Sequence, residues 1–341
     1  MATLAWLTVN HVCNLRCSWC YQREQAGSGK FMPIRLARRL VDFLSETKKV
    51  KNVILIGGEP TLYEYLFELA SYIKRVGMVT NVVSNSIKFA NRTFVERAEE
   101  AGVEAVTTSV KGSSSKEYLT ATGCDVFEAV KTAIRNLEDS NIANQISVTV
   151  STSTMTNWCQ MVRFVKDCGA KNFNFSFEKP TILSDNVVFD DRMSPRNIAG
   201  FIQDVMYPSL LETGVHFKVE MMFPQCVLRD GFVEQLENEN HAFGGCLLVN
   251  REGIVFDPDG FVLPCNHFVG YPLGRYGANF STPEEYLAWK QAGDTGDFYQ
   301  TAKMAPGERC ANCSKWSKCG AGCRLYWLYR GSDELLPSNP V

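Results

Sequence analysis

Residues 4–20 read LAWLTVNHVCNLRCSWC, an apolar run that leads directly into three closely spaced cysteines. The first seven residues have the β-branched and aromatic composition of a buried strand. Five further runs of this kind follow, namely NVILIGG (52–58), TNVVSNS (80–86), VEAVTTSV (103–110), ISVTVSTS (146–153) and KNFNFSFE (171–178). Amphipathic stretches separate them, such as IRLARRLVDFLSE (34–46) and NWCQMVRFVKDCG (157–169). Their spacing predicts helices between the strands.

This alternation predicts an α/β fold, a partial (β/α)6 TIM-like barrel of parallel strands over residues 1–215. In barrel enzymes the chemistry lies in the loops after the strands. The pattern changes after residue 215. There CLLVNREGIVFDPDGFVLPC (246–265) predicts a β-hairpin that turns at DPDG, and a loop-rich tail follows it. We therefore expect a second, C-terminal domain over residues 216–341.

Composition narrows the classes of function. The 341 residues carry a formal net charge of -2 without a basic block, which argues against a nucleic-acid partner. No run approaches the roughly 18 apolar residues of a membrane span, and MATLAWLTVN lacks the features of a signal peptide. A cytoplasmic protein is the expectation. In that reducing compartment, thirteen cysteines in tight clusters indicate metal ligation or redox chemistry rather than disulfides.

Cys13, Cys17 and Cys20 follow the first predicted strand with the spacing C-x3-C-x2-C. Three thiolates can hold three irons of a [4Fe–4S] cluster and leave the fourth iron free for another ligand. The alternative is a zinc site whose fourth ligand is His11 or a later residue.

The segment GGEP (57–60) ends the second predicted strand and therefore lies on the same rim as the cysteines. Gly57 and Gly58 permit a close backbone approach to a ligand. Glu59 can accept a hydrogen bond from a bound amine.

The motif C-x3-C-x-aromatic-C, with Trp19 as the aromatic, and GGEP after the second strand resemble the radical S-adenosylmethionine superfamily. The resemblance implies that the open iron is chelated by the amino and carboxylate groups of S-adenosylmethionine. One electron from the cluster then cleaves this cosubstrate to a 5′-deoxyadenosyl radical, which abstracts a substrate hydrogen. A small electron-transfer protein such as flavodoxin or ferredoxin would supply the electron.

The resemblance also assigns cosubstrate contacts. It places Gly57, Gly58 and Glu59 at the methionyl amino group, Ser84 and Asn85 near the ribose, and Ser109 near the carboxylate. Turn capping is the alternative for Ser84, Asn85 and Ser109. Many relatives read S-x-D-G here, followed by an Arg that also contacts the carboxylate. This chain has SVKG, with Lys111 at the Asp position and no Arg before Gly123, so the partner of the carboxylate stays open.

A second constellation has the pattern C-x13-G-x4-C followed by C-x2-C-x5-C-x3-C. Zinc ribbons are one reading of such pairs. The full pattern is similar to the SPASM domain of many radical S-adenosylmethionine enzymes, in which two auxiliary [4Fe–4S] clusters are bound. By this resemblance the first auxiliary cluster belongs to Cys246, Cys265 and Cys323, and the second to Cys310, Cys313 and Cys319.

The family usually has a seventh cysteine downstream, and residues 324–341 contain none. The fourth ligands are therefore open between Asp333, Glu334, water, a substrate group and Cys226, or one cluster is absent. One or two auxiliary clusters are expected. Cys159 and Cys168, in or after a predicted helix, are expected to be small core residues.

The resemblance leaves several functions open. Oxidative modification of a ribosomally made peptide, by crosslinking or side-chain oxidation, is favoured over dehydrogenation, epimerisation or decarboxylation of a sugar or nucleoside. The chain begins almost at its first strand and leaves no room there for the leader-peptide-binding domain fused to many peptide-modifying relatives, which speaks for a small molecule. This decides little, because such a domain can be a separate leader-peptide-binding protein. Sulfatase maturation is disfavoured, because Asn266 stands where those enzymes carry an Asp base and an amide cannot take up a proton. A non-catalytic, zinc-stapled binding module is the remaining alternative.

Overall fold

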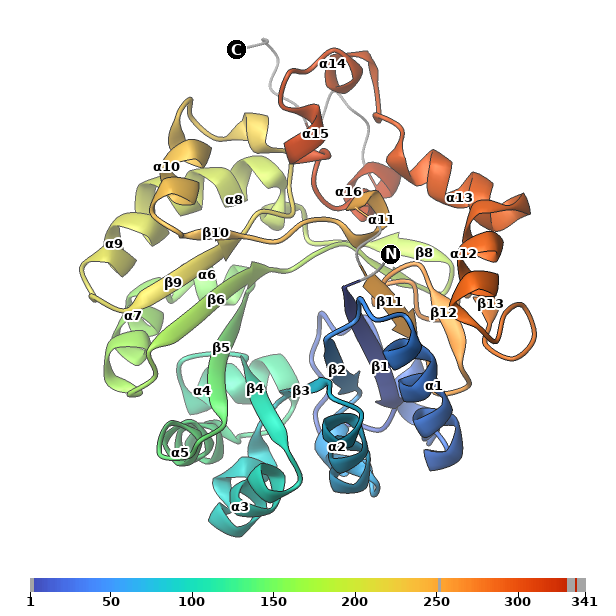
Figure 1. Cartoon of the computed structure of the whole chain (residues 1–341). Coiled ribbons are helices and arrows are strands. Elements are labelled where there is room, and N and C mark those ends of the chain that lie inside the picture. Colours follow the sequence, from blue (N-terminus) through green and yellow to red (C-terminus); the bar gives the residue numbers. More distant parts are fainter. Residues whose placement is uncertain (1–2, 251–252, 330–334, 336–341) are drawn as a thin grey trace.

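The computed structural model describes residues 3–250, 253–329 and 335, and its strands form an arc with helices on the outer side (Figure 1). Six parallel strands in sequence order make the central part of the sheet. They are β1 (Leu4–Asn10), β2 (Asn52–Gly57), β3 (Val79–Ser84), β4 (Val103–Val110), β5 (Ala143–Val150) and β6 (Asn172–Phe177). Each corresponds to one of the six predicted strands, and the predicted α/β fold with a parallel sheet is confirmed.

Helices connect these strands and cover the outer side of the arc. They are α1 (Ile34–Glu46), α2 (Leu66–Arg75), α3 (Arg92–Glu100), α4 (Ser115–Thr122), α5 (Phe127–Glu138), α6 (Thr152–Thr156) and α7 (Trp158–Asp167). In α1 the buried residues recur every three or four positions, so one face packs on the sheet and the charged face meets solvent. Because these six strands are parallel, every loop that follows one of them starts at the same edge of the sheet.

The sheet continues at both edges. Strands β9 (His216–Glu220) and β10 (Ala242–Phe243) extend it beyond β6, while β11 (Gly253–Phe256) pairs in parallel with β1. The predicted hairpin is present as β11 and β12 (Phe261–Leu263), and β13 (Gly274–Arg275) lies beyond it. Strands from both sides of residue 215 thus belong to one sheet. The division into domains 1–215 and 216–341 stays a prediction.

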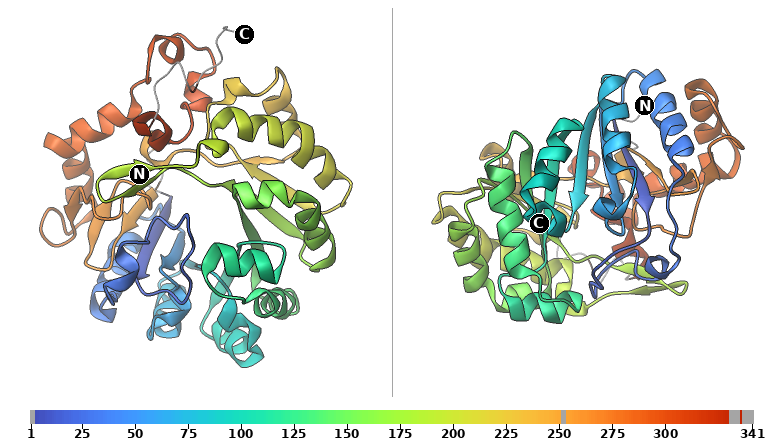
Figure 2. Two further views of the ribbon diagram at one scale, coloured as in Figure 1. Left: turned by 180° about the vertical axis from the view of Figure 1, so that it is seen from behind. Right: turned by 90° about the horizontal axis from the view of Figure 1, so that it is seen from below.

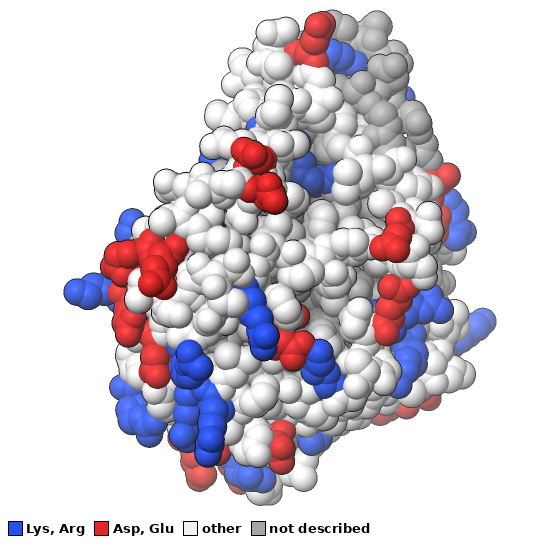
Figure 3. Space-filling model, turned by 90° about the vertical axis from the view of Figure 1, so that its right-hand side faces the viewer, with Lys and Arg blue, Asp and Glu red and all other residues white. Residues whose placement is uncertain are grey.

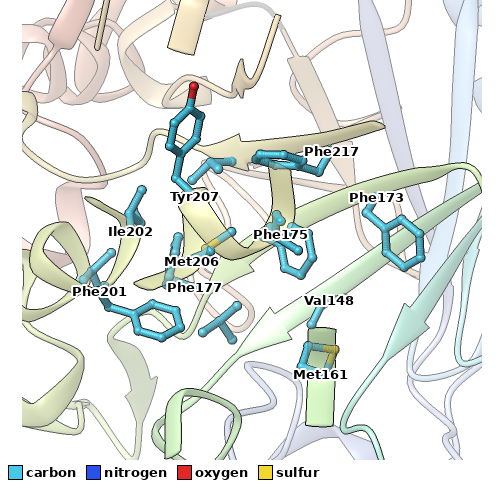
Figure 4. Packing of buried hydrophobic residues seen from close by; sticks show 14 of the residues in the cluster. Val148, Met161, Phe173, Phe175, Phe177, Phe201, Ile202, Met206, Tyr207 and Phe217 are labelled. Atoms are coloured by element: carbon cyan, nitrogen blue, oxygen red, sulfur yellow. The ribbon is translucent and has the colours of Figure 1, made fainter. Parts of the chain in front are cut away.

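The segment between β6 and β9 was not predicted from the sequence. It holds a small hairpin of β7 (Thr181–Leu183) and β8 (Asn186–Val188), then α8 (Pro195–Phe201), a π-helical turn (Ile202–Met206) and α9 (Tyr207–Leu211). The core beneath this segment is aromatic (Figure 4). Phe173, Phe175 and Phe177 alternate along β6 and are at most 4% exposed, which anchors the end of β6 beside the site described below.

After β13 the C-terminal part of the chain continues beside the arc through α12 and α13 (Figures 1 and 2). Its last helices lie at the top of the view in Figure 1, toward α10. Its helices are α10 (Phe232–Asn238), α11 (Leu247–Asn250), α12 (Pro283–Gln291), α13 (Gly293–Lys303), α14 (Glu308–Ala311), α15 (Trp316–Cys319) and α16 (Arg324–Tyr329). An ion pair of 2.8 Å between Lys315 and Glu234 joins α15 to α10. The cysteine-rich tail is therefore packed back onto the barrel.

Two cysteines lie outside the predicted cluster motifs, on or next to helix α7. Cys168 is buried, as expected, but the expectation for Cys159 was wrong, because this side chain is on the solvent side of α7 and is exposed. Acidic and basic side chains are interspersed on the face shown in Figure 3. In the described part of the chain, no helix is both long and apolar enough to cross a membrane.

Candidate functional site

A cavity of about 250 Å³ lies at the carboxyl ends of the parallel strands. Its walls come from the loops after β1, β2, β3, β4 and β6, together with His267 of the C-terminal part. The lining includes every residue predicted for the first site: Cys13, Cys17, Trp19, Cys20, Gly57, Gly58, Glu59, Ser84, Asn85 and Ser109. Residues that are distant in sequence meet here because parallel strands end at a common rim.

The cysteine loop after β1 is held by the backbone at the C-terminal end of helix α4. The N–H groups of Arg16 and Ser18 donate to the carbonyls of Thr122 and Ala121, at 2.9 and 3.0 Å. Burial raises the pKa of Cys13 to about 11, and the nearby Glu59, Cys17 and Cys20 add to the rise. Acidic groups crowded in this way favour a cation as ligand, because a metal ionises the thiols that it binds.

The glycines of GGEP allow the second loop to lie directly on the cysteine loop. A Cβ atom on Gly57 would be 2.6 Å from the carbonyl oxygen of Asn10, and one on Gly58 would be 2.4 Å from that of Val12. The N–H groups of Gly58 and Glu59 donate to these same two carbonyls, at 2.9 and 2.8 Å. The close approach that requires glycine is therefore made to the chain itself.

Glu59 is 1% exposed, and its carboxylate is held by four hydrogen bonds. One oxygen accepts from the N–H and hydroxyl of Thr61 and from the hydroxyl of Ser84, at 3.0, 2.7 and 2.7 Å. The other accepts from the N–H of Asn85 at 2.8 Å. Glu59 thus ties the ends of β2 and β3 together, with one oxygen carrying a single hydrogen bond.

Lys111 stands where many relatives have an Asp, in the segment for which the sequence did not identify a partner of the methionyl carboxylate. Its ammonium donates to the hydroxyl of Ser109 at 2.5 Å, and both side chains line the cavity. Burial raises the pKa of Cys20, and Lys111 opposes that rise, which places the ammonium beside the cysteine loop. Arg16 also lines the cavity, but its guanidinium donates to the carbonyls of Cys13 and Leu15, at 2.7 and 2.8 Å.

Two residues of the site were missed by the sequence analysis. Glu178 and Lys179 follow β6 directly and line the same cavity. Burial raises the pKa of Glu178 to about 7, and the charge of Asp190 contributes. Burial alone would lower the pKa of Lys179. The carboxylate of Glu220, 2.6 Å from its ammonium, has the larger combined effect, so the pKa of Lys179 is raised. The sequence does contain a signal for them, because two adjacent charged residues follow the sixth predicted strand at the rim where barrel enzymes carry their active sites.

The remaining motif cysteines form two groups. Burial raises the pKa of Cys323 to about 12, and the proximity of Cys246 adds to it. Burial likewise raises the pKa of Cys265, with Cys323 and Cys246 adding. The second group lines a cavity of about 470 Å³ and consists of Cys310, Cys313, Cys319 and Cys226. These are the two groups of cysteines that the resemblance to the SPASM domain implies, and their role as ligands of two clusters stays a prediction.

Next to Cys265, the side-chain oxygen of Asn266 and Nδ1 of His267 are buried and have no hydrogen-bond partner among the described residues. Burial, together with nearby Lys179, lowers the pKa of His267 to about 3, so the ring is neutral at pH 7. His11, the alternative zinc ligand, is buried with a ring nitrogen 3.1 Å from Gln22.

Among the described residues, no three His, Cys, Asp or Glu side chains are placed to hold a single metal ion. In a cubane cluster each thiolate binds a different iron, so its ligands do not converge on one point. Iron binding by these cysteines stays a prediction. Asp333 and Glu334, two of the predicted alternatives for a fourth ligand, lie outside the described residues.

Residues 7–168 match the model of the Radical SAM superfamily, where SAM is S-adenosylmethionine. This segment contains β1 to β5 and the loops that carry the cysteines, GGEP and Lys111. The chain therefore carries a Radical SAM domain over these residues and is an enzyme. A domain of this superfamily implies a [4Fe–4S] cluster and S-adenosylmethionine.

Curated relatives are distant in sequence. A probable GTP 3′,8-cyclase of Pyrococcus horikoshii is 22% identical over 261 residues, covering 76% of this chain and 82% of the relative. A 7,8-dihydro-6-hydroxymethylpterin dimethyltransferase of Methanocaldococcus jannaschii is 26% identical over 136 residues, covering 39% and 27%.

Solved structures share the fold along the whole chain. SuiB of Streptococcus suis bound to S-adenosylmethionine has a TM-score of 0.71 at 15% identity, covering 99% of this chain and 77% of SuiB. The enzyme anSMEcpe with bound AdoMet and Cp18Cys peptide has a TM-score of 0.70 at 19% identity, covering 98% and 92%. The likeness includes the part after residue 168, which the family model does not match.

Proposed function

We propose that this enzyme uses S-adenosylmethionine to oxidise a ribosomally made peptide, by crosslinking or side-chain oxidation. The observation that carries the proposal is the convergence of Cys13, Cys17 and Cys20 with Glu59 on one pocket at the carboxyl ends of the strands. The choice of a peptide is supported by two similar folds solved with peptides, SuiB with its precursor peptide SuiA and anSMEcpe with Cp18Cys.

The residues of the pocket fit the two groups that the family implies. Cys13, Cys17 and Cys20 offer three thiolates for the cluster and leave one iron for S-adenosylmethionine. Glu59 keeps hydrogen-bonding capacity for the methionyl amino group, with Gly57 and Gly58 beside it. Ser84 and Asn85 would lie near the ribose. When bound, the cluster supplies the electron that splits S-adenosylmethionine and yields the radical that removes a substrate hydrogen.

Lys111 is proposed to bind the methionyl carboxylate together with Ser109. A carboxylate needs a cation in a partly buried pocket, and relatives of this family place an Arg near it. Lys111 donates to Ser109, the residue predicted to lie near the carboxylate, whereas Arg16, another cation of the cavity wall, donates to backbone carbonyls. The ammonium therefore replaces the missing Arg as a point charge.

The Lys111→Met variant is expected to bind S-adenosylmethionine roughly tenfold more weakly, the scale of one charged hydrogen bond. Equilibrium binding to the anaerobic enzyme measures the effect. Lys111→Arg, which keeps the charge, should recover most of the affinity. Lys116→Met, at an exposed position of α4, is the control. Equal affinity of Lys111→Met and Lys116→Met would remove Lys111 from the site.

Glu178 is proposed to accept the proton that the substrate loses. Oxidation by two electrons removes a hydrogen atom to the deoxyadenosyl radical, then one electron and one proton. A carboxyl group with a pKa of about 7 is matched to proton transfer near neutral pH, and Glu178 lines the cavity. Asn266 stands where sulfatase-maturing enzymes have an Asp, so formylglycine formation is not proposed. In this chain Glu178, the residue directly after β6, would supply the carboxylate instead.

Substrate turnover is expected to rise between pH 6 and 8. Because the raised pKa keeps Glu178 protonated below about pH 7, the base is available only above it. Glu178→Gln should lower kcat/KM about a hundredfold and abolish this rise, while cleavage of S-adenosylmethionine without substrate stays unchanged. Glu212→Gln, on the surface at the end of α9, should keep the wild-type profile. A wild-type pH profile in Glu178→Gln would exclude the assignment.

The auxiliary cysteines are proposed to bind one or two further [4Fe–4S] clusters, which would take up the electron from the substrate radical. Cys246, Cys265 and Cys323 make one set, close to His267 and Lys179 of the cavity wall. Cys310, Cys313 and Cys319 make the other. An electron donor such as flavodoxin or ferredoxin, and a separate leader-peptide-binding protein, complete the proposed system.

A small molecule is the second candidate substrate, supported by the relatives named as probable GTP 3′,8-cyclases. Co-expression of the enzyme with short peptide genes from its genomic neighbourhood separates the two. A peptide that loses two hydrogen atoms, by mass spectrometry, only when the enzyme is present supports the proposal. Unmodified peptides, with consumption of GTP or another nucleotide, would favour the small-molecule alternative.

A further inference from the structure

The second auxiliary cysteine set includes a residue from outside its sequence motif. Cys310, Cys313 and Cys319 lie on one wall of the cavity of about 470 Å³. The connector that follows β9 also lines this cavity, and Cys226 is part of it, in a 3₁₀ turn (Gln225–Val227). Four sulfur side chains therefore surround one cavity, although the motif supplies only three.

Backbone contacts hold the connector against the cysteine loop. The N–H of Gln225, the residue before Cys226, donates to Sγ of Cys319 at 3.3 Å. The N–H of Cys323 donates to the carbonyl of Met222 at 2.8 Å. Both bonds involve residues just before Cys226, and they hold the chain that leads into the turn against the loop that carries Cys319.

Gly322 makes this contact possible. A Cβ atom at this position would lie 2.4 Å from the Cα of Phe223, and the glycine has a φ of +72°. Only glycine combines this backbone conformation with such a close approach. The chain thus uses the glycine of the CGAGC segment to seat the connector on the loop.

Side chains reinforce the arrangement. Lys315 pairs with Glu234 at 2.8 Å, and Lys318 pairs with Glu237, so α15 is joined twice to α10, which follows the connector. These pairs are partly exposed and each is weak, but they define the register of the two segments. Cys226 is exposed on the surface, yet neighbouring atoms partly desolvate its thiol and raise its pKa, and the charges that add to this rise belong to Cys319 and Cys310.

We propose that Cys226 is the fourth cysteine ligand of the second auxiliary cluster, in place of the downstream cysteine that residues 324–341 do not supply. Its thiol loses a proton to solvent and Sγ bonds the iron that Cys310, Cys313 and Cys319 leave open, without any electron transfer. The second cluster is then closed by protein ligands and suits electron relay. The iron without a cysteine ligand then belongs to the cluster of Cys246, Cys265 and Cys323. This inference rests on the proposed iron–sulfur function.

The test uses full-length protein in which Cys13, Cys17 and Cys20 are all replaced by Ala, so that only auxiliary clusters can form. Iron content, the electron paramagnetic resonance of the reduced protein and midpoint potentials are measured anaerobically. Two auxiliary cubanes correspond to about eight irons per chain. Cys226→Ala is expected to convert one of the two clusters to a three-iron form or lose it. Cys159→Ala, an exposed cysteine on α7, should leave both unchanged.

Cys226→Asp keeps a group that can bind iron and is expected to retain four irons in that cluster with a shifted spectrum and potential. It also decides the question if Cys226→Ala does not fold. Unchanged signals in the Cys226 variants, with both clusters present in the parent, would overturn this inference alone. A parent protein without auxiliary iron would overturn the auxiliary clusters themselves and this ligand with them.

Discussion

Replacing Cys17 by Ala is expected to abolish the formation of 5′-deoxyadenosine from S-adenosylmethionine. The three cysteines of the first loop act as one unit, so the loss of one should cost roughly a thousandfold or more. Two remaining thiols cannot hold a cubane at three of its irons. The iron content should fall by about four atoms per chain, because the auxiliary cysteines lie in separate loops.

Cys159→Ala is the matched control for this change, since Cys159 is exposed on the outer helix α7. It should keep wild-type iron and wild-type product formation. Product is quantified by chromatography after anaerobic incubation with dithionite and S-adenosylmethionine. Full activity in Cys17→Ala would show that the first loop does not hold the catalytic cluster.

Gly58→Ala is expected to destabilise the protein and to disable the pocket. The added methyl group would lie 2.4 Å from the carbonyl oxygen of Val12 and 2.6 Å from that of His11. Both neighbours are backbone atoms of the cysteine loop, which must shift to relieve the overlap. Overpacking of this kind costs about 3 kcal/mol of the free energy of unfolding. Cleavage of S-adenosylmethionine should fall with it, because the loop that carries Cys13 moves.

Gly200→Ala provides the comparison, because a Cβ atom there meets nothing within 4 Å and the residue lies in α8. This variant should be as stable as the wild type or slightly more stable, since Ala favours a helix by about 1 kcal/mol over Gly. Thermal unfolding of the two variants measures the contrast. Equal midpoints would mean that the two loops are not packed as described.

The barrel could be predicted from the sequence because its signals are local. The run LAWLTVN matches β1 residue for residue, and VEAVTTSV matches β4. The helix predicted at residues 34–46 is α1 with the same bounds, since its apolar face recurs at helical spacing and no Pro or Gly interrupts it. The order of the strands then follows from short right-handed connections.

The first site was predictable for a similar reason. Cysteines and glycines at fixed offsets after strands one and two must meet at the rim of a parallel sheet. Glu178 was missed because one acidic residue after a strand is common, and only the fold shows that it lines the pocket. Gly58 was expected to allow a close approach to a ligand, but the structure shows that it allows a close approach to the backbone carbonyl of Val12. The spacing of residues in the sequence does not reveal this neighbour.

The C-terminal part depends on contacts that are distant in sequence. The sequence left Cys226 as one of several fourth ligands, because nothing local links residue 226 to residue 319. The hydrogen bond from Gln225 to Cys319 spans 94 positions. The hairpin β7–β8 was missed because each strand has only three residues, too few for alternation to be visible.

We propose that the pocket at the ends of β1 to β6 generates a radical from S-adenosylmethionine. The most direct measurement follows 5′-deoxyadenosine and the first cluster together in anaerobically purified protein treated with dithionite. Binding of S-adenosylmethionine should change the electron paramagnetic resonance signal of the reduced cluster, and 5′-deoxyadenosine should accumulate over repeated turnovers. A protein that holds its full iron, shows no spectral response to S-adenosylmethionine and forms no 5′-deoxyadenosine would contradict the account.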